Sequence, residues 1–176
     1  MNTPIDISEA AGVRYLHFGS DWIQGAMRIR KPNALELAYT REMMAGLLLR
    51  DGLADDAGQW PKKVLIIGLG AASLAKFVYH HCPQARIKVV EIAPSVIAAA
   101  RQFFRLPEED MRFSIHIGCG AQYVMDKDQR YDYILVDGYD QNARAGVLDT
   151  LPFYQALHSR LSSRGLMAVN LFGRSR

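Results

Sequence analysis

Two glycines that follow an aliphatic run form the clearest ligand-binding pattern in the chain. Residues 64–67 are typical of a buried parallel strand, and Gly68-Leu69-Gly70 after them predicts a tight turn into a helix that begins near Ser73. Glycines let a backbone approach a ligand closely, and the free N–H groups of a helix start face the same place. Ser73 occupies the third glycine position of a dinucleotide fingerprint, so the turn does not favour a dinucleotide.

An acidic side chain follows at a spacing that suits ribose binding. Residues 87–91 predict the next strand, and Glu91 ends this strand about 20 residues after the Gly-x-Gly turn. A carboxylate at this place can accept hydrogen bonds from two ribose hydroxyls. The glycine turn and Glu91 together predict an α/β domain that binds a nucleoside.

A second carboxylate ends a later strand. Residues 131–136 predict a buried strand, Asp137 follows it directly, and Asp140 lies in the loop beyond. Ligands bind beyond the carboxyl ends of parallel strands, which favours a functional role for Asp137. Asp140 is explained equally well as a turn residue, because aspartate is common in turns.

The elements that must position these side chains alternate between strands and helices. We expect strands at 64–67, 87–91, 111–117, 131–137 and 166–172, and helices at 34–49, from 73, from 94 and at 151–161. The turn Gly118-Cys119-Gly120 would lie at the same end of the sheet as the first glycine turn. Alternation of this kind predicts a parallel sheet with right-handed crossovers and flanking helices.

A small unit precedes this domain. Residues 1–12 predict a loosely held terminus, and the strand-like runs 13–18 and 22–29 around a Gly-Ser-Asp turn predict a β-hairpin. The chain therefore divides into an N-terminal tail and hairpin at 1–32 and a Rossmann-like nucleoside-binding domain at 33–176.

Composition limits the classes of protein that fit. The chain has 176 residues, 49% hydrophobic and 22% charged, which suits a globular domain with a full core. It shows neither a signal pattern nor an apolar run near the roughly 20 residues that cross a bilayer, so we expect a cytoplasmic protein without a membrane partner. The charge of +3 is scattered, which argues against nucleic acid as a partner. Neither the cysteines nor the histidines have metal-ligand spacing, and we expect no metal.

From about Val13 to Phe172 the sequence resembles the polyamine aminopropyltransferases, the spermidine synthase family, which share the S-adenosylmethionine methyltransferase fold. The segments that carry the resemblance are Trp22-Ile23-Gln24, Tyr39-Thr40-Arg41-Glu42-Met43, the Gly68–Gly70 turn, Val90-Glu91-Ile92, Gly118-Cys119-Gly120 and Val136-Asp137-Gly138-Tyr139-Asp140. The resemblance implies a class I methyltransferase fold. It also implies a transferase that moves an aminopropyl group from decarboxylated S-adenosylmethionine to a small amine such as putrescine.

The same resemblance assigns roles to individual residues. It implies a set of residues that bind the donor nucleoside: Gln24, Tyr39, Gly68, Gly70, Glu91, Cys119 and Gly120. Asp137 would take the proton of the attacking amine, and Asp140 would contact the cationic acceptor. The chemistry is consistent with these roles, because a protonated amine is no nucleophile and a nearby carboxylate can both bind the cation and accept its proton.

Three positions depart from the family pattern. Ala71 replaces an acid that holds the donor's amino group, Cys119 replaces an acid of the adenine-side turn, and Ala93 replaces an acid after the second strand. These departures leave two alternatives open, an S-adenosylmethionine-dependent methyltransferase and a catalytically weak nucleoside-binding domain. The family usually adds two strands beyond the fifth. We expect these two strands to be missing here, which would expose the fifth strand as an edge on which a homodimer could form.

Overall fold

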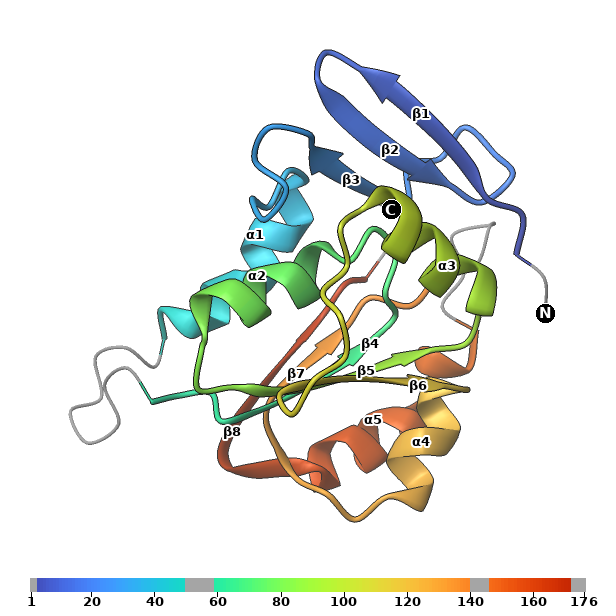
Figure 1. Cartoon of the computed structure of the whole chain (residues 1–176). Helices are drawn as coiled ribbons and strands as arrows, with labels where there is room; N and C mark the ends of the chain where they lie inside the picture. The colour runs from blue at the N-terminus through green and yellow to red at the C-terminus, as the bar shows by residue number, and fades with distance from the viewer. Residues whose placement is uncertain (1–2, 50–58, 140–145, 172–176) are drawn as a thin grey trace, which may run out of the picture.

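The computed structural model describes residues 3–49, 59–139 and 146–171, which form two sheets and their flanking helices (Figure 1). In chain order the elements are β1 Asp6–Ala10, β2 Val13–His17, β3 Gly25–Arg28, α1 Ala38–Met44, the 3₁₀ helix η1 Ala45–Leu47, β4 Lys63–Ile67, α2 Ser73–His81, β5 Arg86–Glu91, α3 Pro94–Phe103, β6 Phe113–Ile117, α4 Gly120–Asp126, β7 Tyr131–Val136, the 3₁₀ helix η2 Gly146–Leu148, α5 Leu151–Ser159 and β8 Leu161–Val169.

The larger sheet has the order β6-β5-β4-β7-β8, and every neighbouring pair in it is parallel. The chain therefore runs outward from β4 through β5 to β6, and then returns to the other side of β4 for β7 and β8. A sheet that reverses its strand order in this way leaves a crevice beyond the carboxyl ends of the strands, where ligands bind. The predicted α/β class with a parallel sheet is confirmed.

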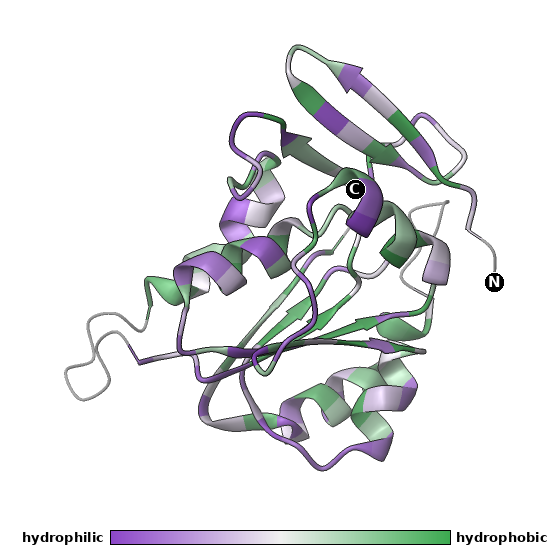
Figure 2. Ribbon diagram, viewed as in Figure 1, coloured by the Kyte–Doolittle hydropathy of each residue, from purple (hydrophilic) through white to green (hydrophobic). Residues whose placement is uncertain are grey.

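Both faces of this sheet are covered, which explains why its central strand β4 is apolar without alternation. In β4, Val64 and Ile66 pack into a cluster with residues of α1, α2 and α3, whereas Leu65 and Ile67 pack into a second cluster with α4 and α5. Figure 1 shows the two helix layers on opposite sides of the sheet, and Figure 2 shows the central strands between them largely in the hydrophobic colour.

The N-terminal region contains one more strand than the sequence predicts. β1, β2 and β3 form an antiparallel sheet, so the prediction of a loosely held terminus is wrong for Asp6–Ala10. Only Ile7 of β1 is partly buried. The strand is held by backbone pairing with β2, and its side chains lack the alternating pattern that would reveal a strand in the sequence.

Two helices also differ from the sequence prediction. α1 begins at Ala38 and not near residue 34, because residues 30–37 form turns in which the amide of Ala34 donates to the Lys31 carbonyl. α4 was not predicted at all, since it has only seven residues and opens on a glycine. Its buried side chains include Ala121, Tyr123 and Val124, which lie on the sheet.

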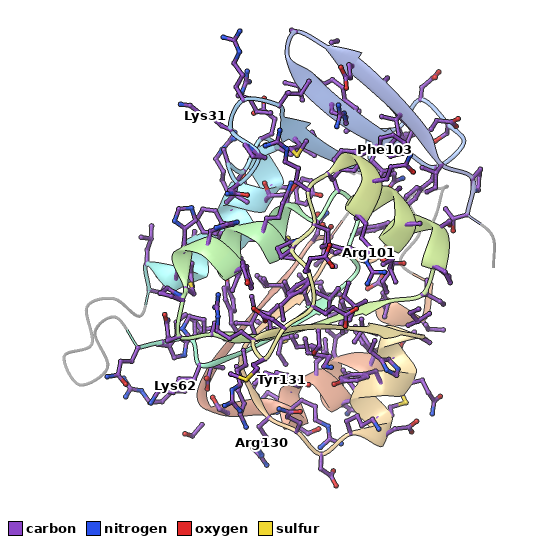
Figure 3. All side chains as sticks on the ribbon, in the orientation of Figure 1. Lys31, Lys62, Arg101, Phe103, Arg130 and Tyr131 are labelled. Carbon is purple, nitrogen blue, oxygen red and sulfur yellow. The ribbon has the colours of Figure 1, made fainter. Side chains whose placement is uncertain are left out.

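Three hydrogen bonds fasten the N-terminal sheet and tail to the larger domain. Arg14 of β2 donates to the carbonyl of Phe103 at the end of α3 (2.6 Å). Ser73 at the start of α2 donates to the carbonyl of Ala26 in β3 (3.1 Å), and Ser95 of α3 donates to the carbonyl of Thr3 (3.1 Å). The side chain of Phe103 lies between α3 and the small sheet, as Figure 3 shows. The small sheet is thereby fixed beside the carboxyl ends of the parallel strands.

The outer edge of β6 is occupied by acidic side chains from the loop that precedes it. Asp110 Oδ1 accepts the amide of Phe113 (2.7 Å), and Glu109 Oε2 accepts the amide of Ile115 (3.1 Å). These amides face away from β5 and would otherwise be open to another strand.

A buried lysine makes the stability of the fold depend on pH. Lys76 of α2 is 1% exposed, and its Nζ donates to the carbonyl of Phe104 at the end of α3 (2.8 Å). Burial, with a smaller effect from the Arg105 charge, lowers the pKa of Lys76 from 10.5 to about 8. The folded protein therefore releases this proton at lower pH than the unfolded chain does.

We expect the free energy of unfolding to rise between pH 8 and 10.5, by at most about 3 kcal/mol from Lys76. The gain arises because the unfolded chain binds more protons than the folded chain in this window. Lys76→Met removes the group and flattens the dependence, whereas Lys63→Met, at an exposed position, preserves it. Urea unfolding at pH 7, 8, 9 and 10 measures the slope, and equal slopes in Lys76→Met and the wild type would contradict the expectation.

Candidate active site

Backbone hydrogen bonds between neighbouring strands continue for one residue beyond the carboxyl ends of the strands. Backbone amides that directly follow the strands still donate to the neighbouring strand: Gly68 to Val90 (2.9 Å), Gly118 to Glu91 (2.9 Å), Asp137 to Ile67 (2.8 Å) and Asn170 to Val136 (2.9 Å). This continued ladder fixes the backbone at the place where the sequence predicts the ligand.

A cavity of about 790 Å³ opens at this edge, between the parallel sheet and the N-terminal sheet. Among the described residues, its wall includes every predicted donor residue and the predicted base: Gln24, Tyr39, Gly68, Gly70, Glu91, Cys119, Gly120 and Asp137. The structure therefore brings together residues that the sequence separates by more than a hundred positions. Asp140 lies outside the described residues.

The first glycine of the turn has a conformation and a neighbour that only glycine accommodates. Gly68 has φ +92°, and a Cβ on it would lie 2.2 Å from the carbonyl oxygen of Asp137. Residues with a side chain rarely adopt this φ, and no Cβ fits at this distance. Glycine at position 68 therefore allows the turn after β4 to pass directly beneath the loop after β7. The glycine turn and the Asp137 loop are in direct contact.

Glu91 is held in place by the turn and by the start of the next helix. Its Oε2 accepts the amide of Leu69 (2.8 Å), and its Oε1 accepts the amide of Ala93 (2.8 Å). Burial raises the pKa of the Glu91 carboxyl, and backbone amides, among them those of Ala93 and Leu69, act against this rise. A carboxylate offers about four acceptor positions, so these bonds leave capacity for ribose hydroxyls.

The rest of the wall is largely apolar. The large apolar side chains that line the cavity come from the β2–β3 loop, from β4, β5 and the residues just after them, from α3 and from η2: Phe18, Trp22, Ile23, Ile67, Leu69, Val90, Ile92, Val96, Val147 and Leu148. Gly120 keeps α4 close to β4, because a Cβ on it would lie 2.4 Å from Ile67 Cγ2. Apolar surface of this kind suits the flat face of a nucleobase.

The three departures from the family pattern have clear positions. Ala71 is buried against Gly25 of β3, where a Cβ on Gly25 would lie 2.6 Å from Ala71 Cβ. Cys119 is partly buried on the cavity wall, and Ala93 contributes its amide to Glu91. At these three positions the site has small neutral side chains instead of negative charge.

Asp137 is bound at both of its carboxylate oxygens. The Tyr39 hydroxyl donates to Oδ2 (3.0 Å), and Nδ2 of Asn170 donates to Oδ1 (2.9 Å). Burial raises the pKa of Asp137, and the hydrogen bonds from Asn170 and Tyr39 act in the opposite direction. Burial and the neighbouring Asp137 also raise the pKa of Tyr39, so its hydroxyl stays protonated near neutral pH and donates the hydrogen bond to Asp137. The carboxylate is oriented and placed to accept a proton from a group in the cavity.

Two residues of this network were not predicted from the sequence. Asn170 lines the cavity at the end of β8, and the hydroxyl of Tyr139 donates to its carbonyl oxygen. The sequence predicts a strand that continues to residue 172, whereas β8 ends at Val169 and leaves Asn170 as the polar residue directly after it. Tyr139 had no comparable signal, because it lies in a loop.

Within residues 3–49, 59–139 and 146–171, no three histidine, cysteine, aspartate or glutamate side chains are close enough to hold a metal ion. Nor does any helix in these ranges have the length and apolar content needed to cross a bilayer.

The doubly covered parallel sheet, with a glycine turn and a strand-end carboxylate beside a large cavity, defines a protein of the class I methyltransferase-like fold. Comparison with known families agrees with this class. The spermine/spermidine synthase domain matches residues 37–170, and the chain therefore belongs to the spermine/spermidine synthase family.

Individual relatives support the same family. The chain is 40% identical over 166 residues to a polyamine aminopropyltransferase of Chromobacterium violaceum, a match that covers 94% of this chain and 60% of the relative. The crystal structure of a spermidine synthase in complex with the transition state analogue AdoDATO matches with a TM-score of 0.62 and 27% identity, over 96% of this chain and 58% of that one. The chain spans about 60% of the length of these curated aminopropyltransferases.

A methyltransferase is also related to the chain. The eEF1A lysine and N-terminal methyltransferase of Mus musculus is 32% identical over 144 residues, which cover 76% of this chain and 20% of the relative.

Proposed function

We propose that the chain transfers an aminopropyl group from decarboxylated S-adenosylmethionine to a small amine such as putrescine. The observation that carries this proposal is the Asp137 carboxylate, which is held by Tyr39 and Asn170 on the wall of the nucleoside cavity. Membership of the spermine/spermidine synthase family and the aminopropyltransferase relatives support the same activity.

In this proposal the donor nucleoside occupies the part of the cavity near Glu91. Glu91 accepts hydrogen bonds from the ribose, and Cys119 and Gly120 lie beside the adenine. The chain that carries the sulfonium passes over Gly68 and Gly70 toward Gln24 and Tyr39. The spermidine synthase relative that binds a transition state analogue supports a nucleoside donor at this site.

Asp137 accepts the proton of the acceptor's ammonium group, which frees the nitrogen lone pair. The nitrogen then forms a bond to the carbon next to the sulfonium, and the carbon–sulfur bond breaks with its electron pair going to sulfur. The products are a secondary ammonium and a neutral thioether nucleoside, so charge and protons balance. A carboxylate whose pKa is raised suits this step, because it accepts a proton more readily near neutral pH. Asp140 is proposed as a contact for the cationic acceptor.

Methyl transfer from intact S-adenosylmethionine is the second candidate. The similarity to a eukaryotic methyltransferase favours it, and the two donors share the same nucleoside. The arrangement around Glu91 therefore does not separate these functions, whereas a direct comparison of the donors does.

The deciding experiment is calorimetric titration of the purified chain with decarboxylated S-adenosylmethionine, intact S-adenosylmethionine and methylthioadenosine, followed by mass spectrometry of reactions with putrescine. We expect the decarboxylated donor to bind more tightly than the intact donor and to yield spermidine. Preference for the intact donor would support methyl transfer, and no binding of any nucleoside would contradict both functions.

Glu91→Gln tests the nucleoside part of the proposal. The amide that replaces the carboxylate places an N–H group against the ribose hydroxyls or against the backbone amides of Leu69 and Ala93, which are themselves donors. We therefore expect all three nucleosides to bind at least about tenfold more weakly. Glu109→Gln is the matched control, because Glu109 also accepts a backbone amide but lies outside the cavity.

The proposal also covers the domain division, the cellular location and the oligomeric state of the protein. We propose a division into residues 1–32 and 33–176, a cytoplasmic location and a homodimer that pairs along the edge of β8. Within the described residues β8 pairs only with β7, which leaves its outer edge for a second chain. Light scattering during size-exclusion chromatography would detect the dimer, and a monomer at micromolar concentration would contradict it.

A further inference from the structure

We propose that Asn170 is a positioning residue that orients the Asp137 carboxylate and keeps it ionised for the amine proton. The sequence motifs leave Asn170 without a role, and the inference rests on the proposed function of Asp137 as the base.

Asn170 is fixed to the Asp137 loop at three points. Its amide donates to the carbonyl of Val136 (2.9 Å), its Nδ2 donates to Asp137 Oδ1 (2.9 Å), and its carbonyl accepts the hydroxyl of Tyr139. The residue therefore bonds to the positions directly before, at and shortly after the carboxylate, and two of these bonds fix its backbone beside Asp137 while the third holds its side chain on the carboxylate.

The carboxylate is consequently held from two directions. Tyr39 of α1 donates to Oδ2, and Asn170, directly after β8, donates to Oδ1, so each oxygen retains acceptor capacity toward the cavity. Loss of either donor would let the carboxylate rotate about its Cβ–Cγ bond. The position of the proton acceptor relative to a bound amine depends on both contacts.

The two donors must also offset the cost of burying a charge. The described titratable side chains on the cavity wall are Tyr39, Glu91, Cys119, Asp137 and Tyr139, and no lysine, arginine or histidine is among the described lining residues. The described wall therefore places no basic side chain beside Asp137. Neutral donors keep the carboxylate ionised without a cation that would compete with, or repel, the positively charged acceptor. Hydrogen bonds to the charged form favour ionisation.

The test is a pH titration of Asp137 in the ligand-free protein, in which carbon-13 NMR of labelled aspartate monitors the carboxyl group. The signal of Asp137 is identified by its absence in Asp137→Asn. In Asn170→Leu, which removes the donor at similar volume, we expect the pKa of Asp137 to rise by about one unit. The acidic limb of the kcat profile should shift upward by the same amount, with kcat at pH 7 lowered about tenfold and donor KM little changed.

Ser162→Ala is the matched control. Ser162 donates to Asp132 Oδ1 (2.7 Å), which is also a side-chain bond from β8 to β7, but at the other end of the two strands. If Asn170→Leu does not fold, Asn170→Asp keeps the shape of the side chain and should raise the apparent pKa of the coupled pair of acids further.

An unchanged pKa of Asp137 in a folded Asn170 variant, or an equal shift in Ser162→Ala, would overturn the inference. The NMR titration needs no turnover. A chain that shows the pKa shift but transfers no aminopropyl group would therefore contradict the proposed function alone, whereas an active Asn170→Leu variant with an unshifted acidic limb would contradict the positioning role alone.

Discussion

Asp137→Asn is expected to lower the rate of aminopropyl transfer by at least about 100-fold, because an amide cannot accept the amine proton. The substitution keeps the size of the side chain, and an amide can still bond to Tyr39 and Asn170. Donor binding, which depends on Glu91 and the glycine turn, should change by less than about threefold. Stopped reactions analysed by mass spectrometry and calorimetric titration of the donor measure the two effects separately.

Asp132→Asn provides the control for this substitution. Asp132 lies on the same strand as Asp137, but its carboxylate accepts the backbone amides of Lys62 and Lys63 at the opposite end of the sheet, where Figure 3 shows Lys62 and Arg130. Its replacement should leave transfer nearly unchanged. In the wild type, kcat should fall as the pH drops through the raised pKa of Asp137, above its ordinary 3.8. Near-normal transfer by Asp137→Asn would show that another group accepts the proton.

Gly68→Ala is expected to abolish nucleoside binding and to destabilise the fold by more than about 2 kcal/mol. The added Cβ would lie 2.2 Å from the carbonyl oxygen of Asp137, and a backbone oxygen can move aside only if the whole loop moves. Since Glu91 is anchored by the amide of Leu69, the displacement would also reach the ribose contact. Urea unfolding and calorimetric titration of the donor would measure both losses.

Gly12→Ala distinguishes this clash from ordinary backbone strain. Gly12 has φ +76°, but nothing lies within 4 Å of the Cβ that alanine would add. Its replacement should cost about 1 kcal/mol and leave donor binding intact. Equal losses in the two variants would indicate that φ alone matters and that the contact between the turn and the Asp137 loop does not.

The parts of the fold that the sequence predicts well are those whose side chains carry the signal. Buried parallel strands such as β4 and β7 carry apolar side chains on both faces over most of their length, so their positions and their polar end residues are visible as a pattern. The glycine turn, Glu91 and Asp137 follow from strand ends in the same way, and the structure places all of them on one cavity.

The parts that the sequence does not predict are held by contacts that leave no periodic pattern. β1 depends on backbone pairing, and its side chains are mostly exposed. The bond between Tyr39 and Asp137 joins positions 98 residues apart, so spacing along the chain cannot indicate it. Asn170 was missed for another reason, because the apolar run continues past it to residue 172 and the end of β8 at Val169 is visible only in the structure.

The acidic loop before β6 has a consequence for how the molecule behaves at high concentration. A strand approaching this edge would have to displace Asp110 and Glu109 from the amides of Phe113 and Ile115, and would meet negative charge where it needs donors. Ordered aggregation by addition of strands is therefore disfavoured on the β6 side. Carboxylates, and not a further strand, end the sheet there, and they give this edge the resistance to polymerisation that native sheets need.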